Sequence, residues 1–265
     1  MGDTGTFDNL LQQSVNTAHD LWLRGWAERN AGNISVRLTE SQLDRRFAQD
    51  ADWCDTGVAV ADLAGQHFLF TGSGQHMRNV ERDPQGTLGV IELDDKGARY
   101  RTVWGFSRGC IPASELPAHL RVHAARKDDY AVIHTHPTNI IALTCVLDLD
   151  AASLTRLLWE MHPECLVVFP DGCGFIGFEL PGGDELAQAT AEALKTRRMT
   201  VWQNHGIVAA GPDLDTAFGL IDTAEKAAQI YLKAASLGPV TNRLSIDQLR
   251  ALAKRFNLKT DLLED

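Results

Sequence analysis

The chain has 265 residues, of which 44% are hydrophobic, and its formal net charge is −10. This length and composition predict one globular domain over residues 1–265, because a chain of this size can bury a substantial core and no compositional break divides it. The negative charge and the lack of a run rich in lysine or arginine argue against nucleic acid as a partner, since polyanion binding requires cationic side chains.

The first half of the chain predicts one amphipathic helix followed by antiparallel strands. Apolar residues recur at helical spacing over residues 8–28, and a strand-like alternation follows over 34–38. Residues 40–65 carry little periodicity and are expected to form a surface excursion. Gly97 is expected to take a positive φ angle in a hairpin turn. Further strands are expected over residues 67–71, 89–93 and 99–104.

The second half predicts helices alternating with strands. Ser114 is expected to cap a helix that runs to about residue 126. Helices are also expected from residues 139, 152 and 184, over 213–237 and over 245–256, and strands over 131–134, 165–169 and 201–210. The pattern has too few βαβ units for a doubly wound parallel sheet. It therefore predicts an α/β fold with a mixed, largely antiparallel central sheet layered between helices.

The cysteines and the hydropathy pattern predict a cytoplasmic protein. The chain has five cysteines and no C-x-x-C pair, which is typical of reduced thiols rather than of a disulfide framework. The N-terminal region lacks a basic segment followed by an apolar one, and no apolar run is long enough to span a bilayer. These cysteines are Cys54, Cys110, Cys145, Cys165 and Cys173.

Two histidines in one apolar segment form the most informative motif of the chain. His134 and His136 are two residues apart, and strand side chains alternate between faces, so both rings should project to the same side. His205 ends another apolar run and would complete a three-nitrogen metal site with an open coordination position. A single histidine at a strand end is more often a hydrogen-bonded structural residue, so this interpretation depends on the three occurring together with an acidic partner.

Glu115 is the acidic residue best placed to accompany such a site. In the first turn of a helix its carboxylate would stabilise the helix dipole by about 0.3–1 kcal/mol, or it would act as a general base beside a metal-bound carbonyl compound. His119 and His123 follow at helical spacing and offer a rival metal face with Glu115. Because that helix lacks an H-E-x-x-H arrangement, the sequence favours His134, His136 and His205 as ligands.

Two segments rich in glycine, asparagine and serine are suited to binding an oxyanion. Residues 29–33 follow the first helix, and residues 71–74 follow a strand. Glycine lets the backbone approach a phosphate closely, while asparagine, serine and free N–H groups donate hydrogen bonds to it. Such clusters often form only a turn, and neither segment matches a nucleotide-binding pattern. A small phosphorylated substrate is compatible with both.

Taken in chain order, these motifs resemble those of the class II sugar-phosphate aldolases. The matching segments are residues 25–33, 71–74, 114–119, 134–139, 164–172, 204–206 and 218–226, which together cover nearly the whole chain. Several independent motifs in one order are far more specific than any single one. The likeness is strongest to the members of this superfamily that cleave L-rhamnulose 1-phosphate.

The resemblance implies a role for each candidate residue. His134, His136 and His205 would bind one Zn2+ per subunit, with Glu115 as the enolising acid/base beside it. On sequence alone Glu160 and Glu164 are equal candidates for a second acid, whereas the resemblance selects Glu164, supplied by a neighbouring subunit of a homotetramer. The substrate phosphate would be held by Asn30, Asn33, Ser73, Gly74 and Ser114.

The implied reaction is retro-aldol cleavage of L-rhamnulose 1-phosphate to dihydroxyacetone phosphate and L-lactaldehyde, in L-rhamnose catabolism. A divalent cation can stabilise the enediolate that this cleavage leaves. Ala113 departs from the pattern, because these aldolases usually have a hydroxyl residue there that contacts phosphate. Alternatives within the superfamily are an L-fuculose-1-phosphate aldolase, a ribulose-5-phosphate 4-epimerase and a sugar-phosphate dehydratase. A non-catalytic, adducin-like binding module is the alternative from another class, although such a module would be expected to lose metal ligands.

Overall fold

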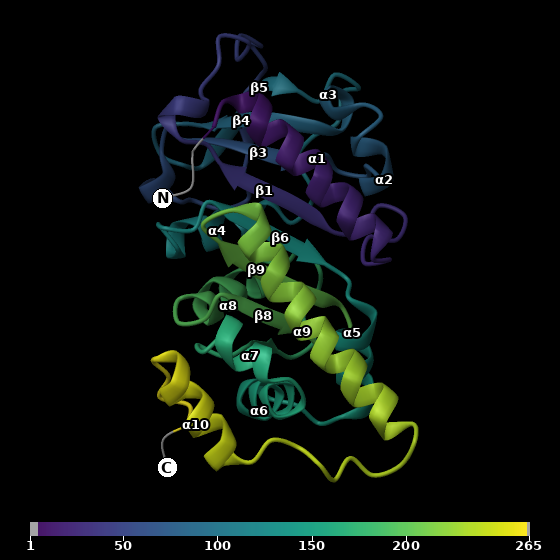
Figure 1. The fold of residues 1–265 in the computed structure, drawn as a ribbon. Coiled ribbons are helices and arrows are strands. Elements are labelled where there is room, and N and C mark those ends of the chain that lie inside the picture. Colours follow the sequence, from purple (N-terminus) through teal and green to yellow (C-terminus); the bar gives the residue numbers. More distant parts are fainter. Residues whose placement is uncertain (1–4, 264–265) are drawn as a thin grey trace.

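A computed structural model of the chain describes residues 5–263, and one nine-stranded sheet runs through that part of the molecule (Figure 1). The strand order is β2-β5-β4-β3-β1-β6-β9-β8-β7, and only β7 and β8 pair in parallel. This arrangement confirms the predicted α/β fold with a mixed, largely antiparallel sheet between helices. The strands are β1 (Asn33–Arg37), β2 (Cys54–Asp55), β3 (His67–Thr71), β4 (Leu88–Leu93), β5 (Arg99–Gly105), β6 (Ala131–Thr135), β7 (Gly174–Ile176), β8 (Met199–Trp202) and β9 (Gly206–Gly211).

Helices cover both faces of the sheet. Helices α1 and α9 lie across the face nearest the viewer in Figure 1, while α4 and α8 pack together on the other face. Helices α6, α7 and α10 gather at the end of the molecule beyond β8. The helices are α1 (Phe7–Leu23), α2 (Met77–Val80), α3 (Pro84–Thr87), α4 (Leu116–Ala125), α5 (Thr138–Val146), α6 (Ala151–Met161), α7 (Pro163–Val168), α8 (Asp184–Leu194), α9 (Leu214–Ala235) and α10 (Ile246–Phe256), and short 3-10 helices span Glu40–Gln42 and Ala61–Leu63.

Alternation along β6 and β9 decides which layer each side chain faces. Val132 and Val208 belong to the apolar cluster that contains residues of α4 and α8, whereas Ile133 belongs to the cluster that contains residues of α9. Because His134 is two residues beyond Val132, its ring lies on the α4 side of the sheet. This period of two therefore places the histidine next to the start of α4.

Two predicted helix boundaries differ from those observed. The first helix ends at Leu23 rather than near residue 28, because Gly25 takes φ +75° and the Trp26 N–H donates to the Leu21 carbonyl. Glycine tolerates this left-handed conformation, which closes a helix. The prediction of Ser114 as the helix cap is wrong by one residue: Glu115 is the cap residue of α4, and its side chain makes no capping hydrogen bond.

Two predicted strands are also wrong. Residues 165–169, expected as a strand, lie mostly in helix α7, which Pro163 begins in the position where a missing N–H costs nothing. A short apolar run does not by itself distinguish a buried strand from a buried helix. Residues 201–210, expected as one strand, form β8 and β9 joined by a tight turn in which Asn204 has φ +57°.

The hairpin of β4 and β5 confirms the prediction at Gly97, which has φ +62°. The predicted caps Asp213 and Ser245 also form, since their side chains accept hydrogen bonds from the backbone N–H groups of Thr216 and Gln248. Among residues 5–263, the helices are all too short or too polar to cross a bilayer.

Candidate metal centre

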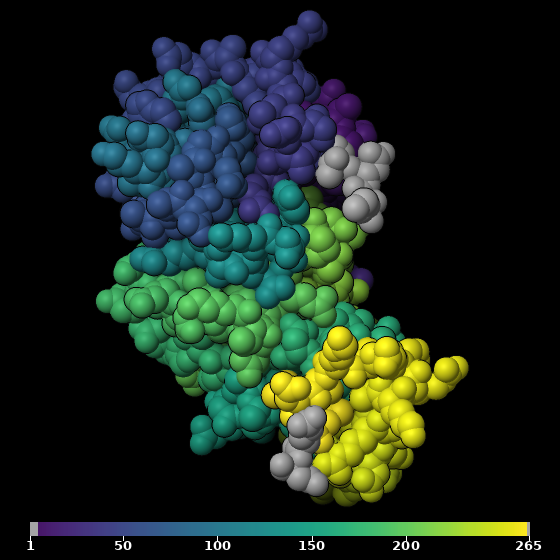
Figure 2. Space-filling view, turned by 90° about the vertical axis from the view of Figure 1, so that its left-hand side faces the viewer, coloured from purple at the N-terminus to yellow at the C-terminus, as the bar shows by residue number. Residues whose placement is uncertain are grey.

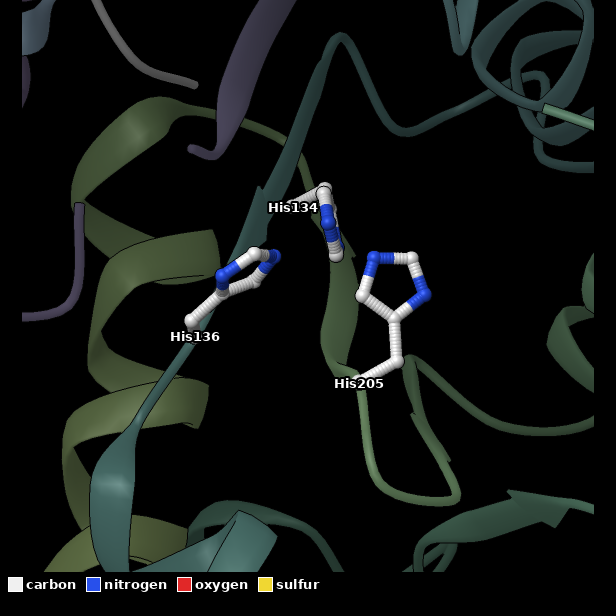
Figure 3. A group of neighbouring side chains, drawn as sticks. All are labelled: His134, His136 and His205. Carbon is white, nitrogen blue, oxygen red and sulfur yellow. The ribbon is translucent and has the colours of Figure 1, made fainter. Parts of the chain in front are cut away.

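Three histidines from two separate segments converge at one end of the β6–β9 pair. His134 lies in β6, His136 follows the strand by one residue, and His205 lies in the turn between β8 and β9 (Figure 3). Their ring centroids are 5.0–5.2 Å apart, and one nitrogen of each lies within 4.8 Å of the others. The structure therefore brings together the three residues that the sequence indicated as metal ligands.

Hydrogen bonds at the far side of two rings determine their tautomers. His134 Nδ1 lies 3.0 Å from the Ile207 carbonyl oxygen, and His136 Nδ1 lies 2.8 Å from Glu28 Oε1. A carbonyl oxygen or a carboxylate only accepts, so Nδ1 of each ring donates and Nε2 keeps its lone pair. A partner on the outer nitrogen is the usual arrangement for a metal-ligating histidine.

Glu115 faces the same point from the start of α4. Its Oε2 lies 3.5 Å from His134 Nε2, and its Oε1 lies 3.9 Å from His205 Nε2. The Asn33 amide donates to Oε2 across 2.6 Å, and both residues are buried. The imidazole lone pairs and the Glu115 carboxylate point towards one another, and few hydrogen-bond donors offset their negative potential. Such an arrangement favours a cation between them. The donor set of the centre therefore fits a divalent metal.

Burial favours the neutral form of two of the imidazoles, those of His134 and His205, and the neutral form is the one that binds metal. Burial lowers the pKa of His134 well below the ordinary value, and the neighbouring His136 and His205 lower it further. Burial also lowers the pKa of His205, against the opposing effect of the Glu115 charge. These shifts favour unprotonated nitrogens that are available to a metal near neutral pH.

Tight packing holds the centre in place. The Trp202 ring lies 4.5 Å from the His134 ring and 4.9 Å from the His205 ring, and its indole N–H donates to Thr190 Oγ1. A Cβ at Gly206 would lie 2.5 Å from the Thr135 carbonyl oxygen and 3.1 Å from His134 Cε1. Only glycine fits at this position without displacing the ligands.

His119 and His123, the rival metal face, serve a different purpose. Both rings are buried, and both form hydrogen bonds with Ser35 Oγ at 2.7 and 2.8 Å. Burial lowers the pKa of His119 to about 3, which keeps it neutral. These two histidines therefore connect α4 to β1 through one hydroxyl, and they lie outside the group of three that could share an ion.

The residues predicted to hold phosphate lie on neighbouring segments beside Glu115. The Ser73 N–H donates to the Ile111 carbonyl across 2.7 Å, and Gly72 forms a bridge with Pro112, so residues 71–74 run beside residues 111–114. Ser73 is half-buried and Gly74 has φ +71°. Asn30, Gly74 and Ser114 are exposed, while Asn33 is buried against Glu115.

Glu164 lies apart from this group. It is exposed in the first turn of α7, and among the described residues it has no hydrogen bond or ion pair with Glu115 or the three histidines. Glu160, the other sequence candidate, pairs with Arg156 at 2.5 Å. Within one chain, Glu115 is thus the carboxylate that faces the inner nitrogens of the histidines, while Glu28 contacts the outer nitrogen of His136.

The sequence analysis missed three residues that shape the centre. Glu28 orients His136, Trp202 packs against two ligands, and Gly206 permits the close approach of the strands. A glycine directly after a candidate ligand was a usable signal for Gly206, since glycine within a strand often marks a close approach. No local sequence pattern indicated that Glu28 would contact His136, because the two residues are 108 positions apart.

The sequence of the chain also matches a known protein family. Residues 12–232 match the family model of the class II aldolase and adducin N-terminal domain. The chain belongs to the class II aldolase and adducin family. Class II aldolases are metal-dependent, and the three-histidine group of this chain agrees with that property.

The chain is 44% identical over 257 residues to rhamnulose-1-phosphate aldolase of Mannheimia succiniciproducens, with 94% of each chain covered. It is 42% identical to the enzyme of that name from Escherichia coli K12, again with 94% of each covered. Among solved structures, a sugar-phosphate aldolase from Thermotoga maritima matches with a TM-score of 0.79 and 31% identity, covering 89% of this chain and 98% of that one.

We predict that Gly206→Ala weakens both metal binding and folding. The added Cβ would force the Thr135 carbonyl and the two histidine rings apart, and overpacking of this kind costs about 1–3 kcal/mol. Denaturant unfolding and metal analysis of the purified variant measure the two effects. Gly219→Ala is the matched control, because nothing lies within 4 Å of a Cβ there and alanine favours the helix. Stability and metal content equal to those of the parent protein would contradict the packing argument.

Proposed function

We propose that this protein is a zinc-dependent lyase that cleaves L-rhamnulose 1-phosphate to dihydroxyacetone phosphate and L-lactaldehyde in L-rhamnose catabolism. The observation that carries the proposal is the convergence of three imidazoles with the carboxylate of Glu115. Relatives that are 42–44% identical over 94% of this chain bear the name rhamnulose-1-phosphate aldolase, which supports the choice of substrate.

Zn2+ is the metal that this donor set suits best. Three histidine nitrogens with an open fourth position are typical of catalytic zinc. His134, His136 and His205 would hold one ion per subunit. When bound there, the ion would polarise the substrate carbonyl and stabilise the negative charge that bond cleavage leaves.

Glu115 is proposed as the acid/base of the dihydroxyacetone phosphate half. Cleavage breaks the bond between carbon 3 and carbon 4, and the electron pair stays on carbon 3 as an enediolate. Glu115 would then deliver a proton to carbon 3, and it would remove that proton in the synthetic direction. Asn33 would position this carboxylate, because its amide donates to Oε2 across 2.6 Å.

Glu164 is proposed as the second acid/base, which takes the proton from the hydroxyl on carbon 4 as the aldehyde forms. Its exposure at the start of α7, apart from the histidines of its own chain, supports a role in the centre of a neighbouring subunit. This requires a closed ring of subunits in which each chain lends Glu164 to the next. We propose a homotetramer.

The phosphate is proposed to bind where residues 71–74 run beside residues 111–114. Asn30, Asn33, Ser73, Gly74 and Ser114 would donate to it, with the second N–H of the Asn33 amide available for this contact. The Ala113 N–H is already bonded to the Thr71 carbonyl, and the side chain has no hydroxyl. The phosphate would therefore have one side-chain donor fewer than in the pattern that this sequence resembles.

We further propose that residues 1–265 form one domain and that the protein works in the cytoplasm. The strands of the described residues form one sheet, with β2 and β7 at its two edges, and this supports one domain. All five cysteines are free, which suits a reducing compartment.

Purified protein loaded with zinc is expected to release dihydroxyacetone phosphate from L-rhamnulose 1-phosphate. A chelator should abolish this activity, and added zinc should restore it, because the enediolate charge needs the cation. A coupled assay with glycerol-3-phosphate dehydrogenase measures the product, with L-fuculose 1-phosphate and L-ribulose 5-phosphate as comparison substrates. Absence of turnover on every ketose phosphate by metal-replete protein would refute the lyase proposal, while an epimerised product would identify a different reaction.

Asn33→Ala is expected to lower kcat by about 10- to 100-fold while bound zinc stays unchanged. The reason is the loss of a hydrogen bond to a charged group, worth about 1.5–3 kcal/mol. Loss of a phosphate contact should raise KM in the same variant. Asn242→Ala, at an exposed loop position, is the matched control. An unchanged kcat would show that Asn33 does not position Glu115.

Mixing two inactive variants tests the shared site. Glu164→Ala lacks the donated acid, and His134→Ala lacks a metal ligand, so neither alone is expected to be active. After co-expression and random assembly, about one site in four would combine intact histidines from one chain with Glu164 from its neighbour. Activity near a quarter of the parent value is therefore expected. If Glu164 served the histidines of its own chain, every site would lack either His134 or Glu164. The mixture would then stay inactive.

A further inference from the structure

Helix α5 joins the two segments that carry the metal ligands. Its first residue, Thr138, comes two positions after His136, so the start of the helix limits where that ligand can lie. Near the other end of the helix, the Thr144 hydroxyl accepts from the Asn204 N–H across 2.9 Å. Asn204 directly precedes His205 in the turn between β8 and β9. The position of α5 therefore affects two of the three histidines.

The start of α5 has no cap from its own sequence. Pro137 occupies the cap position, and a proline side chain has no atom that accepts a hydrogen bond. The N–H groups of a first helical turn have no partner within the helix, so they need an acceptor from elsewhere. Glu225 of α9 supplies it, because its Oε1 accepts from the Asn139 backbone N–H at 3.0 Å and its Oε2 accepts from the Ile140 N–H at 2.9 Å. The side-chain amide of Asn139 adds a third hydrogen bond, of 2.6 Å, to Oε1.

Glu225 is buried where α9 lies beside α5 (Figure 1). Burial raises the pKa of its carboxyl group, while the hydrogen bonds from Asn139 and Ile140 oppose that rise. A glutamine would lose less solvation at this position, but its NH2 group would face one of the backbone N–H donors. Only a carboxylate accepts hydrogen bonds with both oxygens, so the two N–H groups at the start of α5 require the acidic residue.

Two other contacts hold the strand side of the same segment. The His136 N–H and the Thr135 hydroxyl both donate to the Trp26 carbonyl, at 2.9 and 2.7 Å. The outer nitrogen of the His136 ring is bonded to Glu28. These bonds fix the residue at the end of β6, and Glu225 fixes the helix that follows it. The backbone of His136 is thus held between a contact at Trp26 and a contact at Glu225.

We propose that Glu225 is a positioning residue of the metal centre. Through α5 it fixes the place of His136 and, at the far end of that helix, the turn that carries His205. It lies outside the group of three ligands and acts on them only through the backbone. The role assigns a function to one residue of the segment 218–226, which belongs to the aldolase pattern but has no group among the ligands. This inference rests on the proposed metal centre and is independent of which sugar phosphate is cleaved.

Zinc binding by Glu225→Gln, measured on the full chain without substrate, tests the proposal. The substitution keeps the size of the side chain but places an NH2 group against an N–H donor at the start of α5. The zinc dissociation constant, measured by competition with a chromophoric chelator, is expected to rise about tenfold, the lower end of the effect of losing a residue that orients a metal ligand. The visible spectrum of Co2+ bound at the centre should change too, because it depends on ligand geometry. Glu225→Asp, which keeps the carboxylate, should restore part of the affinity.

Two variants control for a general loss of helix capping. Asp213→Ala removes the side chain that caps α9 itself, beyond the end of β9 that lies away from His205. Ser245→Ala removes the cap of α10, which Figure 2 shows in yellow at one end of the molecule. Both are expected to unfold at a lower urea concentration than the parent and to bind zinc with the parent's affinity. A loss of affinity in either control as large as in Glu225→Gln would overturn the proposal, since the effect would then be one of stability alone.

Thr144→Val tests the other end of α5 with a side chain of similar shape. It removes the hydroxyl that holds Asn204, so a weaker zinc affinity is expected here as well. Folded Glu225→Gln that shows the parent's zinc affinity and Co2+ spectrum would overturn the proposal. If that variant does not fold, the same result for Thr144→Val would overturn it. A parent protein that binds no zinc would refute the metal centre itself, and this inference with it.

Discussion

The antiparallel pairing of β6 with β9 is the constraint on which the rest of the site depends. Thr135 pairs with Ile207 at the end of this ladder, so Gly206 and His205 come directly beside the segment that carries His134 and His136. The approach is close enough that only glycine fits at residue 206. A shift of one residue in this register would turn His134 to the opposite face of the sheet, towards α9. Strand register thus determines whether the three rings can share an ion.

The pairing of β6 with its other neighbour, β1, explains why the Glu115 side chain does not cap its own helix. An acidic residue at the start of α4 could stabilise the helix through its backbone N–H groups, yet the side chain accepts from Asn33 and points towards the histidines. Asn33 begins β1, the neighbour of β6, and pairs with His134. The carboxylate is therefore positioned by β1, the strand beside the one that carries His134. Its charge acts at the centre, and α4 lacks a capping hydrogen bond from this side chain.

Much of this arrangement could be predicted from local patterns. The period of two placed His134 and His136 on one side of a strand, and the alternation of helices and strands indicated a layered α/β domain. The same reasoning failed at residues 165–169 and 201–210, where apolar runs carry no clear period. At the second of these, Asn204 turns the chain between β8 and β9, so His205 lies in a turn that is held to α5 by the hydroxyl of Thr144.

The sequence by itself indicated the candidate metal ligands, the candidate general base and the fold class, because residue type and short-range spacing suffice for these. Tertiary structure alone decided that Glu28 orients His136, that Asn33 holds Glu115, and that His119 and His123 share Ser35. The two residues that each of these contacts joins lie more than 30 positions apart in the sequence. Their distances follow from how the sheet and helices pack, which no local pattern encodes.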